Sequence, residues 1–253
     1  MILTEEFLQV EQRFTQLDAR PHRMMQAVLA MSKKGIIGRG ADEIPWRCSP
    51  DMRRFKALTI GNVLVLGYRT YIGMVKNWSK EHVLPGRDIV VLSFTDDASN
   101  AGIMKAHTSV HTACLTAGKK RSELDRTLSI PMMKLSLIGH DAYRRMINAA
   151  IGEIIEFAQG KPIFLGGGGN TYGMFSAFID KYDVTVVDVE PEGDDLVSLI
   201  GLPRLHLIGA GLLSDPWSHL DPPDNRVDVH QLAQAHDDKS GVGCKFYTVH
   251  PLS

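Results

Sequence analysis

The sequence predicts an α/β fold with a central, mostly parallel, twisted sheet, flanking helices and an antiparallel strand at the C-terminus. Apolar runs of strand length recur along the chain, and residues 62–66 and 88–93 are among the clearest. Helix-like patterns separate several of these runs, and such alternation favours a parallel sheet. No internal repeat or low-complexity block points to another architecture.

Short local signals bound the predicted elements. Ser49 and Pro50 suit the N-cap and the first helical position, so a helix is expected to begin there and run to about residue 58. Lys33-Lys34-Gly35 is typical of a turn. The predicted strands are 26–31, 62–66, 88–93, 162–165, 183–190 and 245–250, and the other predicted helices are 141–159 and 171–179.

The domain organisation is predicted to be one domain with additions. Residues 1–22 are expected to form a helical extension, because apolar residues recur between positions 7 and 17 as on one helix face. The pattern leaves open whether this helix docks on its own core or on a partner. Residues 23–253 form the domain itself, with insertions at about 96–132 and 196–242.

Composition and charge argue against several classes of protein. A formal net charge of −1 gives no reason to expect nucleic acid or an anionic membrane as a partner. The longest apolar runs are far shorter than a membrane span, and the first residues lack the layout of a signal peptide. Three widely spaced cysteines suit neither a disulfide framework nor a zinc cluster. We therefore expect a cytoplasmic protein without a metal site, and the sequence does not indicate its oligomeric state.

Two glycine-bearing turns are candidates for a phosphate-binding site. Gly67-Tyr68-Arg69-Thr70 follows one predicted strand, and the run Gly166-Gly167-Gly168-Gly169 follows another. Ligands of open α/β sheets bind at such strand ends, where helix N-termini offer free N–H groups. Neither stretch matches the G-x-G-x-x-G fingerprint, and a single glycine run is as well explained by a plain turn.

The stretch IPWRCSPDMRRFK contains one carboxylate, Asp51, near the start of the helix predicted from residue 49. Asp51 and Phe55 are four residues apart and therefore share a helix face. If this face lines a pocket, partial desolvation raises the pKa of the acid and suits it to proton transfer. The plain alternative is a first-turn acid that interacts with the helix dipole.

Further motifs turn this stretch into a family resemblance. Ile36-Ile37-Gly38, the stretch from Ile44 to Lys56, Gly67 to Tyr71, Leu84 to Arg87, the glycine run with Tyr172, and Thr185 with Glu192-Gly193-Asp194 occur in one order. Together they resemble the dihydrofolate reductase family. The resemblance covers roughly residues 24–95, 135–195 and 243–250. It implies that fold, and hydride transfer from NADPH to 7,8-dihydrofolate to give tetrahydrofolate.

The resemblance also implies roles for individual residues. Asp51 would bind the pterin and promote protonation of N5, with Trp46 ordering a water molecule and Thr185 hydrogen-bonding the carboxylate. Arg87 would pair with the glutamate α-carboxylate of the substrate. The other expected substrate-binding positions are Leu29, Ala30, Met52, Phe55, Met74 and Gly166, although core packing also explains the two methionines. The expected cofactor-binding positions are Ile37, Gly67, Arg69, Thr70, Ser93, Gly167, Gly168, Gly169 and Tyr172, with a cis peptide bond between Gly167 and Gly168.

Three positions depart from the family pattern. Tyr68 stands where the family has a basic residue near the 2′-phosphate of the cofactor, and Phe94 follows Ser93 where a polar or basic residue is common. NADH is therefore not excluded as the cofactor. Gly166 replaces a branched aliphatic residue, which widens the expected pocket wall.

Two alternative functions keep the same fold. One is a reductase of another pterin or pyrimidine, as in riboflavin synthesis, although such enzymes generally lack the P-W-x4-D-x3-F pattern. The other is a non-catalytic binding or assembly module. The intact set Trp46, Asp51, Phe55, Arg87 and Thr185 argues against both.

Overall fold

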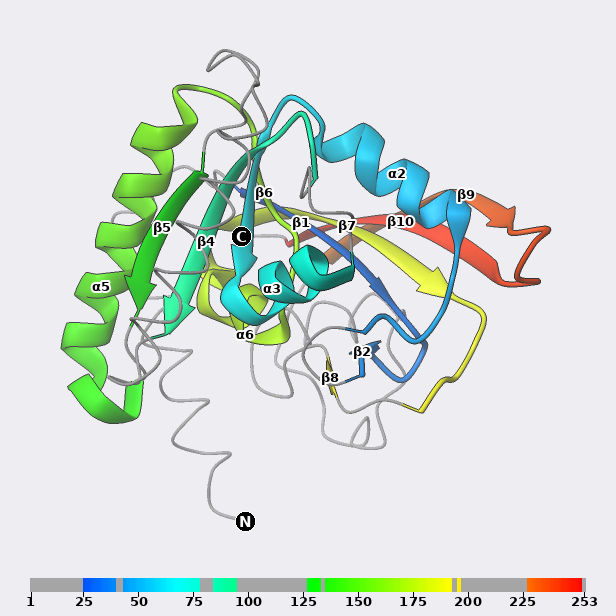
Figure 1. The fold of residues 1–253 in the computed structure, drawn as a ribbon, viewed down its shortest axis with the longest axis horizontal. Coiled ribbons are helices and arrows are strands. Elements are labelled where there is room, and N and C mark those ends of the chain that lie inside the picture. Colours follow the sequence, from blue (N-terminus) through cyan, green and yellow to red (C-terminus); the bar gives the residue numbers. More distant parts are fainter. Residues whose placement is uncertain are drawn as a thin grey trace. The chain divides into compact units, whose positions relative to one another are not determined.

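The computed structural model describes residues 25–39, 43–77, 84–94, 127–132, 135–192, 195–196 and 227–251. Figure 1 shows the elements that these residues form. The chain divides into two compact units, of which unit 1 comprises Met1–Leu58 and Leu165–Ser253 and unit 2 comprises Thr59–Phe164. The predicted N-terminal helix lies outside the described residues, as does most of both predicted insertions.

Unit 1 is built on four strands in the order β1-β7-β10-β9. β1 and β7 are parallel, whereas β10 is antiparallel to both β7 and β9. A second, two-stranded sheet pairs β2 with β8. The elements of unit 1 are β1 Met25–Met31, β2 Ile36–Gly38, α2 Ser49–Thr59, α6 Gly169–Met174, the 3-10 helix Ser176–Phe178, β7 Ile179–Val187, β8 Asp195–Leu196, β9 Val227–His236 and β10 Gly243–Pro251.

Unit 2 contains strands in the order β5-β4-β3-β6, and its β3-β4 and β4-β5 pairs are parallel. Residues 63–66 of β3 are completely buried, as expected of a parallel strand covered on both faces. The elements of unit 2 are β3 Val63–Gly67, α3 Tyr68–Asn77, β4 Asp88–Phe94, β5 Thr127–Met132, α5 Leu135–Ala158 and β6 Ile163–Leu165, whose last residue belongs to unit 1. The predicted α/β class, with mostly parallel strands and antiparallel C-terminal strands, is confirmed.

Three predicted boundaries were wrong. Residues 127–132, which we assigned to an insertion, form β5 beside β4. Residues 227–236, expected to be mainly loop, form the ten-residue strand β9. β7 begins at Ile179 rather than at residue 183, so the preceding helical segment is shorter than predicted. In each case strand pairing overrides a weak local pattern: β5 pairs with β4 and β7 with β1, both distant in sequence, whereas β9 pairs with β10, the next strand.

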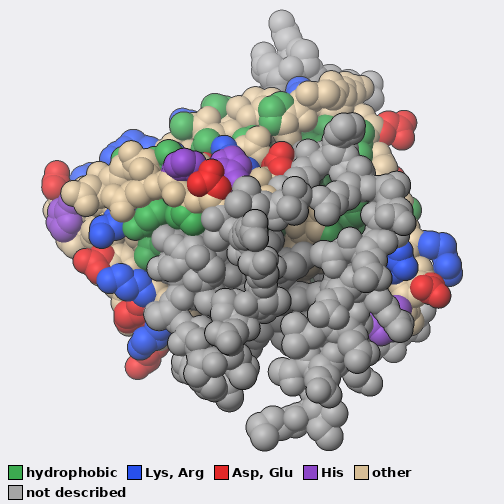
Figure 2. Space-filling model, turned by 180° about the vertical axis from the view of Figure 1, so that it is seen from behind, with side chains coloured by type: hydrophobic (Ala, Val, Ile, Leu, Met, Phe, Trp, Pro, Cys, Tyr) green, Lys and Arg blue, Asp and Glu red, His purple; other side chains and the backbone are tan. Residues whose placement is uncertain are grey.

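On the face shown in Figure 2, Lys and Arg side chains are interspersed with Asp and Glu side chains. Within the described part of the chain, no helix is both long and apolar enough to cross a membrane.

Candidate active site

Helix α2 of unit 1 contacts one face of β7 and β10 at three successive levels. Residues 183, 185 and 187 of β7 share this face, because side chains alternate along a strand. Cys48, just before α2, packs with Val187 and Cys244. One helical turn further on, Asp51 is hydrogen-bonded to Thr185, and Arg54 contacts Asp183 at the third level. Spacings of three residues on the helix and two on the strand therefore keep helix and strand in register.

Asp51 is the acid that this arrangement positions. Burial raises the pKa of its carboxyl group, whereas the hydrogen bond from Thr185 and the positive charge of Arg54 lower it, and the net shift is upward. Thr185 lies in a row of paired residues across the sheet, between Ala30 of β1 and Phe246 of β10. The predicted partnership of Asp51 with Thr185 is thus present in the geometry. A carboxyl group with a raised pKa can hold a proton closer to neutral pH than an exposed aspartate does.

Tyr172 lies next to this acid in α6. Its side chain is buried and its hydroxyl group donates a 2.7 Å hydrogen bond to the Val28 carbonyl oxygen of β1. Burial, followed by the negative charge of Asp51, raises the pKa of the phenol, which therefore stays neutral. Tyr172 thus joins the glycine turn before α6 to the strand that carries Leu29 and Ala30.

The glycine turn differs from the expectation in one respect. Gly167 and Gly168 both have positive φ angles, 153° and 50°, but their peptide bond is trans, and the described residues contain no cis peptide bond. The predicted cis bond was therefore wrong. Two successive glycines reach the required turn through positive φ values, which are accessible to glycine without a Cβ clash.

The N-terminus of α2 is capped from another part of the chain. The first helical hydrogen bond runs from the Met52 N–H to the Cys48 carbonyl, so Ser49 is already helical and the predicted N-cap was wrong by one residue. The Ser49 N–H donates instead to Asp237 Oδ2 at 2.6 Å. The hydrogen bonds that Asp237 accepts from Ser49, Lys239 and Ser240 hold its pKa well below its usual range. The turn after β9 thereby fixes the start of the helix that bears Asp51.

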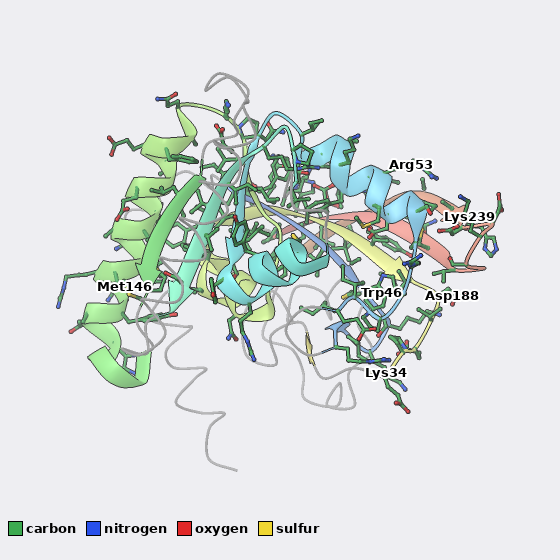
Figure 3. The ribbon with its side chains drawn as sticks, viewed as in Figure 1. Lys34, Trp46, Arg53, Met146, Asp188 and Lys239 are labelled. Carbon is green, nitrogen blue, oxygen red and sulfur yellow. The ribbon has the colours of Figure 1, made fainter. Side chains whose placement is uncertain are left out.

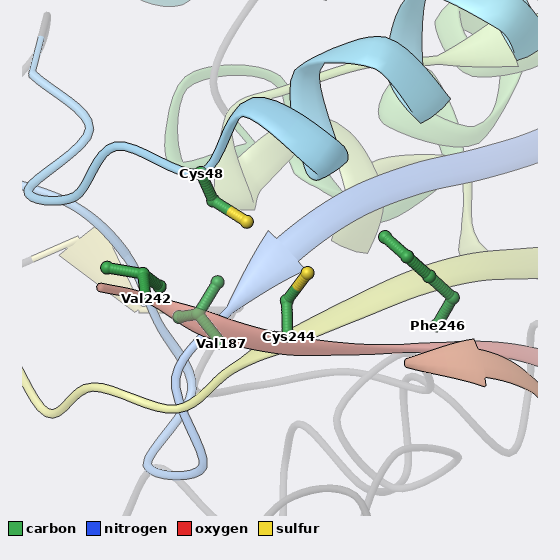
Figure 4. Close-up of a cluster of buried hydrophobic side chains, with 5 residues drawn as sticks. All are labelled: Cys48, Val187, Val242, Cys244 and Phe246. Carbon is green, nitrogen blue, oxygen red and sulfur yellow. The ribbon is translucent and has the colours of Figure 1, made fainter. Parts of the chain in front are cut away.

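Apolar side chains surround the same end of α2. Met52 and Ile44 are 43% and 54% exposed. Phe55 is half-buried. Trp46 packs against the cluster of Cys48, Val187, Val242, Cys244 and Phe246 shown in Figure 4. Figure 3 shows Trp46 near the start of α2.

Other predicted site residues lie in unit 2. Arg87 is buried, and its guanidinium donates to Thr59 Oγ1 at 2.7 Å and to the Pro85 carbonyl at 3.0 Å. These bonds fix the plane of the guanidinium, which is what two-pronged recognition of a carboxylate requires.

The predicted cofactor residues of unit 2 lie mainly at the end of β3. Gly67 ends the strand and α3 begins at Tyr68, so Arg69 and Thr70 are in the first helical turn. Arg69 is exposed and Met74 is half-buried in the same helix. Ser93 differs from the expectation of a cofactor-facing residue, because it is buried and its Oγ lies 3.5 Å from the Ile130 carbonyl of β5.

The remaining predicted residues follow the strands of unit 1. Leu29 is buried and Ala30 half-buried near the end of β1, Ile37 is half-buried in β2, and Gly166 and Gly169 flank the positive-φ pair. Within the described residues, no group of three or more His, Cys, Asp or Glu side chains could hold a metal ion.

Comparisons with known proteins agree with this geometry. The sequence profile of the dihydrofolate reductase family matches residues 24–125. A dihydrofolate reductase of Mycobacterium tuberculosis is 37% identical over 102 residues, which are 38% of this chain and 61% of that protein. The type 9 dihydrofolate reductase of Escherichia coli is 25% identical over 175 residues, 69% of this chain and 76% of that protein.

The chain resembles the dihydrofolate reductase family over residues 24–125.

A solved dihydrofolate reductase from Enterococcus faecalis, complexed with NADP(H) and RAB-propyl, shares the fold. It has a TM-score of 0.52 and 19% sequence identity, and the match covers 92% of this chain and 98% of that chain. The alignment with the mycobacterial member of the family spans only about three fifths of that protein's length. The comparisons therefore establish the fold of the chain, and the reaction is a proposal.

Sequence reasoning missed four residues that build this candidate site. Arg54, Asp183, Asp237 and Cys244 each contact α2 or the residue before it, or lie against Asp51. Three of the four lie more than 120 residues from α2 in sequence, so no local spacing could reveal them. Only Arg54 carried a signal, since it is three residues after Asp51 and therefore on a neighbouring helical turn.

Proposed function

We propose that this protein reduces 7,8-dihydrofolate to 5,6,7,8-tetrahydrofolate with a hydride from NADPH. The observation that supports the proposal best is Asp51, whose carboxyl pKa is raised by burial while Thr185 fixes its orientation. In the balanced reaction, dihydrofolate, NADPH and one proton give tetrahydrofolate and NADP⁺. The residues of the chain must therefore bind two ligands and deliver one proton.

Asp51 would serve binding and proton delivery together. Its carboxylate would accept hydrogen bonds from the 2-amino group and ring N–H of the pterin. The same interaction favours protonation at N5, through a water molecule ordered by Trp46. Thr185 would not transfer a proton itself. Its hydroxyl group would hold the Asp51 carboxyl group in one orientation through their hydrogen bond. Met52 and Phe55, on the same helix, would contact the pterin and aminobenzoyl rings.

The charged tail of the substrate needs a different partner. Arg87 would bind the α-carboxylate of the glutamate moiety, because its guanidinium is held in one plane by Thr59 and Pro85. This geometry suits a bidentate pair and would be lost with lysine.

The chain also offers residues that fit a dinucleotide. NADPH, when bound, supplies the hydride. Gly168 and Gly169 precede and begin α6, where a backbone without side chains permits close approach of a pyrophosphate. In unit 2, Thr70 and Arg69 lie in the first turn of α3, and the exposed cation of Arg69 suits the 2′-phosphate that distinguishes NADPH from NADH.

A spectrophotometric assay tests the proposal. Reduced nicotinamide absorbs at about 340 nm, and dihydrofolate should cause this absorbance to fall when enzyme is added. We expect Asp51→Asn to lower the rate at pH 7 by about 10²- to 10⁴-fold, the range for loss of a general acid or base. Asp188→Asn is the matched control, because Asp188 is exposed just after β7 and its carboxylate forms a weak 3.9 Å surface ion pair with Lys33.

The outcome that would overturn the proposal is equally specific. No dihydrofolate-dependent oxidation of NADPH or NADH at micromolar enzyme would exclude a dihydrofolate reductase. Equal rates with both cofactors, unchanged in Arg69→Gln, would show that Arg69 does not select NADPH.

A further inference from the structure

Arg54 is a charged residue beside the acid that the proposed mechanism does not use. It lies three residues after Asp51 in α2, so the two side chains emerge on neighbouring turns of one helix face. Its neighbour Arg53 differs: it is exposed, and Figure 3 shows it on the outer side of the helix. One of two adjacent arginines is therefore directed to the sheet and the other to solvent.

The Arg54 guanidinium is fixed by two contacts from different strands. Its Nη2 donates to Asp183 Oδ1 at 2.6 Å, where the Arg54 side chain is 23% exposed and that of Asp183 only 1%. Its Cζ lies 5.4 Å from the centre of the Phe246 ring, within the range of a cation–π contact. A buried carboxylate and an aromatic face together hold the cation far more firmly than an exposed ion pair would.

The register of β7 couples this cation to the acid. Asp183 and Thr185 are two residues apart on the same face of β7, and Phe246 is the residue paired with Thr185 across to β10. The residue that hydrogen-bonds Asp51 and the two residues that hold Arg54 thus belong to one small block of sheet. Movement of Arg54 away from Asp51 would break contacts on both strands.

We propose that Arg54, held by Asp183 and Phe246, is a positioning residue whose fixed positive charge restrains proton uptake by Asp51. The effect of Arg54 on catalysis rests on the proposed function. The effect of Arg54 on the titration of Asp51 does not. Burial raises the pKa of Asp51, and the Thr185 hydrogen bond and the Arg54 charge both oppose this shift. Arg54 supplies the opposing charge, and Asp183 limits that charge by partly neutralising it.

Other titratable groups near Asp51 do not replace Arg54. Tyr172 of α6 stays neutral because burial and the charge of Asp51 raise its pKa. On β10, burial and the hydrogen bond with Cys48 raise the pKa of the Cys244 thiol to about 12, so it too is neutral at physiological pH. Lys181 of β7 lies two residues before Asp183, and its Nζ is 3.0 Å from Asp183 Oδ2.

The test is the titration of the Asp51 carboxyl carbon by NMR in the full-length protein without ligands, assigned with Asp51→Asn. Arg54→Met should move the midpoint to higher pH, because a cation is lost. Asp183→Asn should move it to lower pH, because Arg54 is no longer neutralised. Arg54→Lys should stay closer to wild type than Arg54→Met, and Arg53→Met should leave the midpoint unchanged.

The two opposite directions separate an electrostatic role from a packing role. If Arg54 only supports the fold, Arg54→Met and Asp183→Asn will both lower the thermal midpoint, and the titration will shift the same way in both or not at all. Either result overturns the inference. If Asp183→Asn does not fold, the titration midpoints of Arg54→Met and Arg54→Lys decide by themselves. Equal midpoints in these two variants overturn the inference.

Kinetics give a second readout if the wild-type protein reduces dihydrofolate. The rate should fall as pH rises through the apparent pKa of the acid site. For each variant, the rate at a fixed alkaline pH is divided by the plateau rate of that variant at low pH. We expect this fraction to be about threefold or more larger for Arg54→Met than for Asp183→Asn. A wild-type protein without reductase activity would refute the proposed function, while the NMR titration would still decide the role of Arg54.

Discussion

Removal of one hydroxyl group tests how the glycine turn is attached to the sheet. Tyr172 is 3% exposed, and its hydroxyl group donates to the Val28 carbonyl at 2.7 Å. Tyr172→Phe keeps the ring and deletes this bond. A buried carbonyl that loses its donor costs about 1–3 kcal/mol, so the free energy of unfolding should fall by about that amount. For a chain of this size, the thermal midpoint should fall by roughly 2–4 °C per kcal/mol.

The assay is urea denaturation of wild type and variant, followed by tryptophan fluorescence and circular dichroism. Tyr247→Phe is the matched control, because Tyr247 is half-buried in β10 and its hydroxyl group has no hydrogen-bond partner among the described residues. The reasoning fails if Tyr172→Phe unfolds within about 0.5 kcal/mol of wild type, the range of surface substitutions, or if Tyr247→Phe loses as much.

Three further predictions concern pH and thiol chemistry. Burial raises the pKa of Asp51 in the native state above its unfolded value, so the charged acid destabilises the fold as pH rises. Asp51→Asn should therefore be more stable than wild type at pH 8 and equal to it near pH 3. Equal thermal midpoints at pH 8 would contradict this. The depressed pKa of Asp237 acts in the opposite sense, so Asp237→Asn should be less stable at pH 7 and the difference should shrink as the pH falls below about 4, as calorimetry at several pH values would show. Finally, Cys48 and Cys244 are each 3% exposed. In a Cys114→Ser background, a thiol reagent should therefore modify them only as fast as the protein unfolds. Rapid labelling of the native protein would contradict this and show that the buried cluster around Cys48 and Cys244 opens in the native state.

The strand and helix pattern was largely predictable because it depends on short-range periodicity. β3 and β4 were found within a residue of their bounds, since buried parallel strands are continuous apolar runs. β5 and β9 were not found as strands, because their residues are polar or weakly patterned and acquire strand structure from their partners. The helix start illustrates the same limit, since Ser49 resembles an N-cap locally but receives its capping carboxylate from Asp237.

The sequence by itself determined the α/β class and the resemblance to dihydrofolate reductases, because the spacing from Trp46 to Phe55 and the order of the later motifs are properties of the chain. It also singled out Asp51 and Thr185. Only the tertiary structure decided what surrounds the acid. Arg54 meets Asp183 because a three-residue step on a helix matches a two-residue step on a strand, and that strand lies 129 residues further along the chain. The pKa of a carboxyl group depends on burial and on nearby charges, and both are set by such long-range contacts.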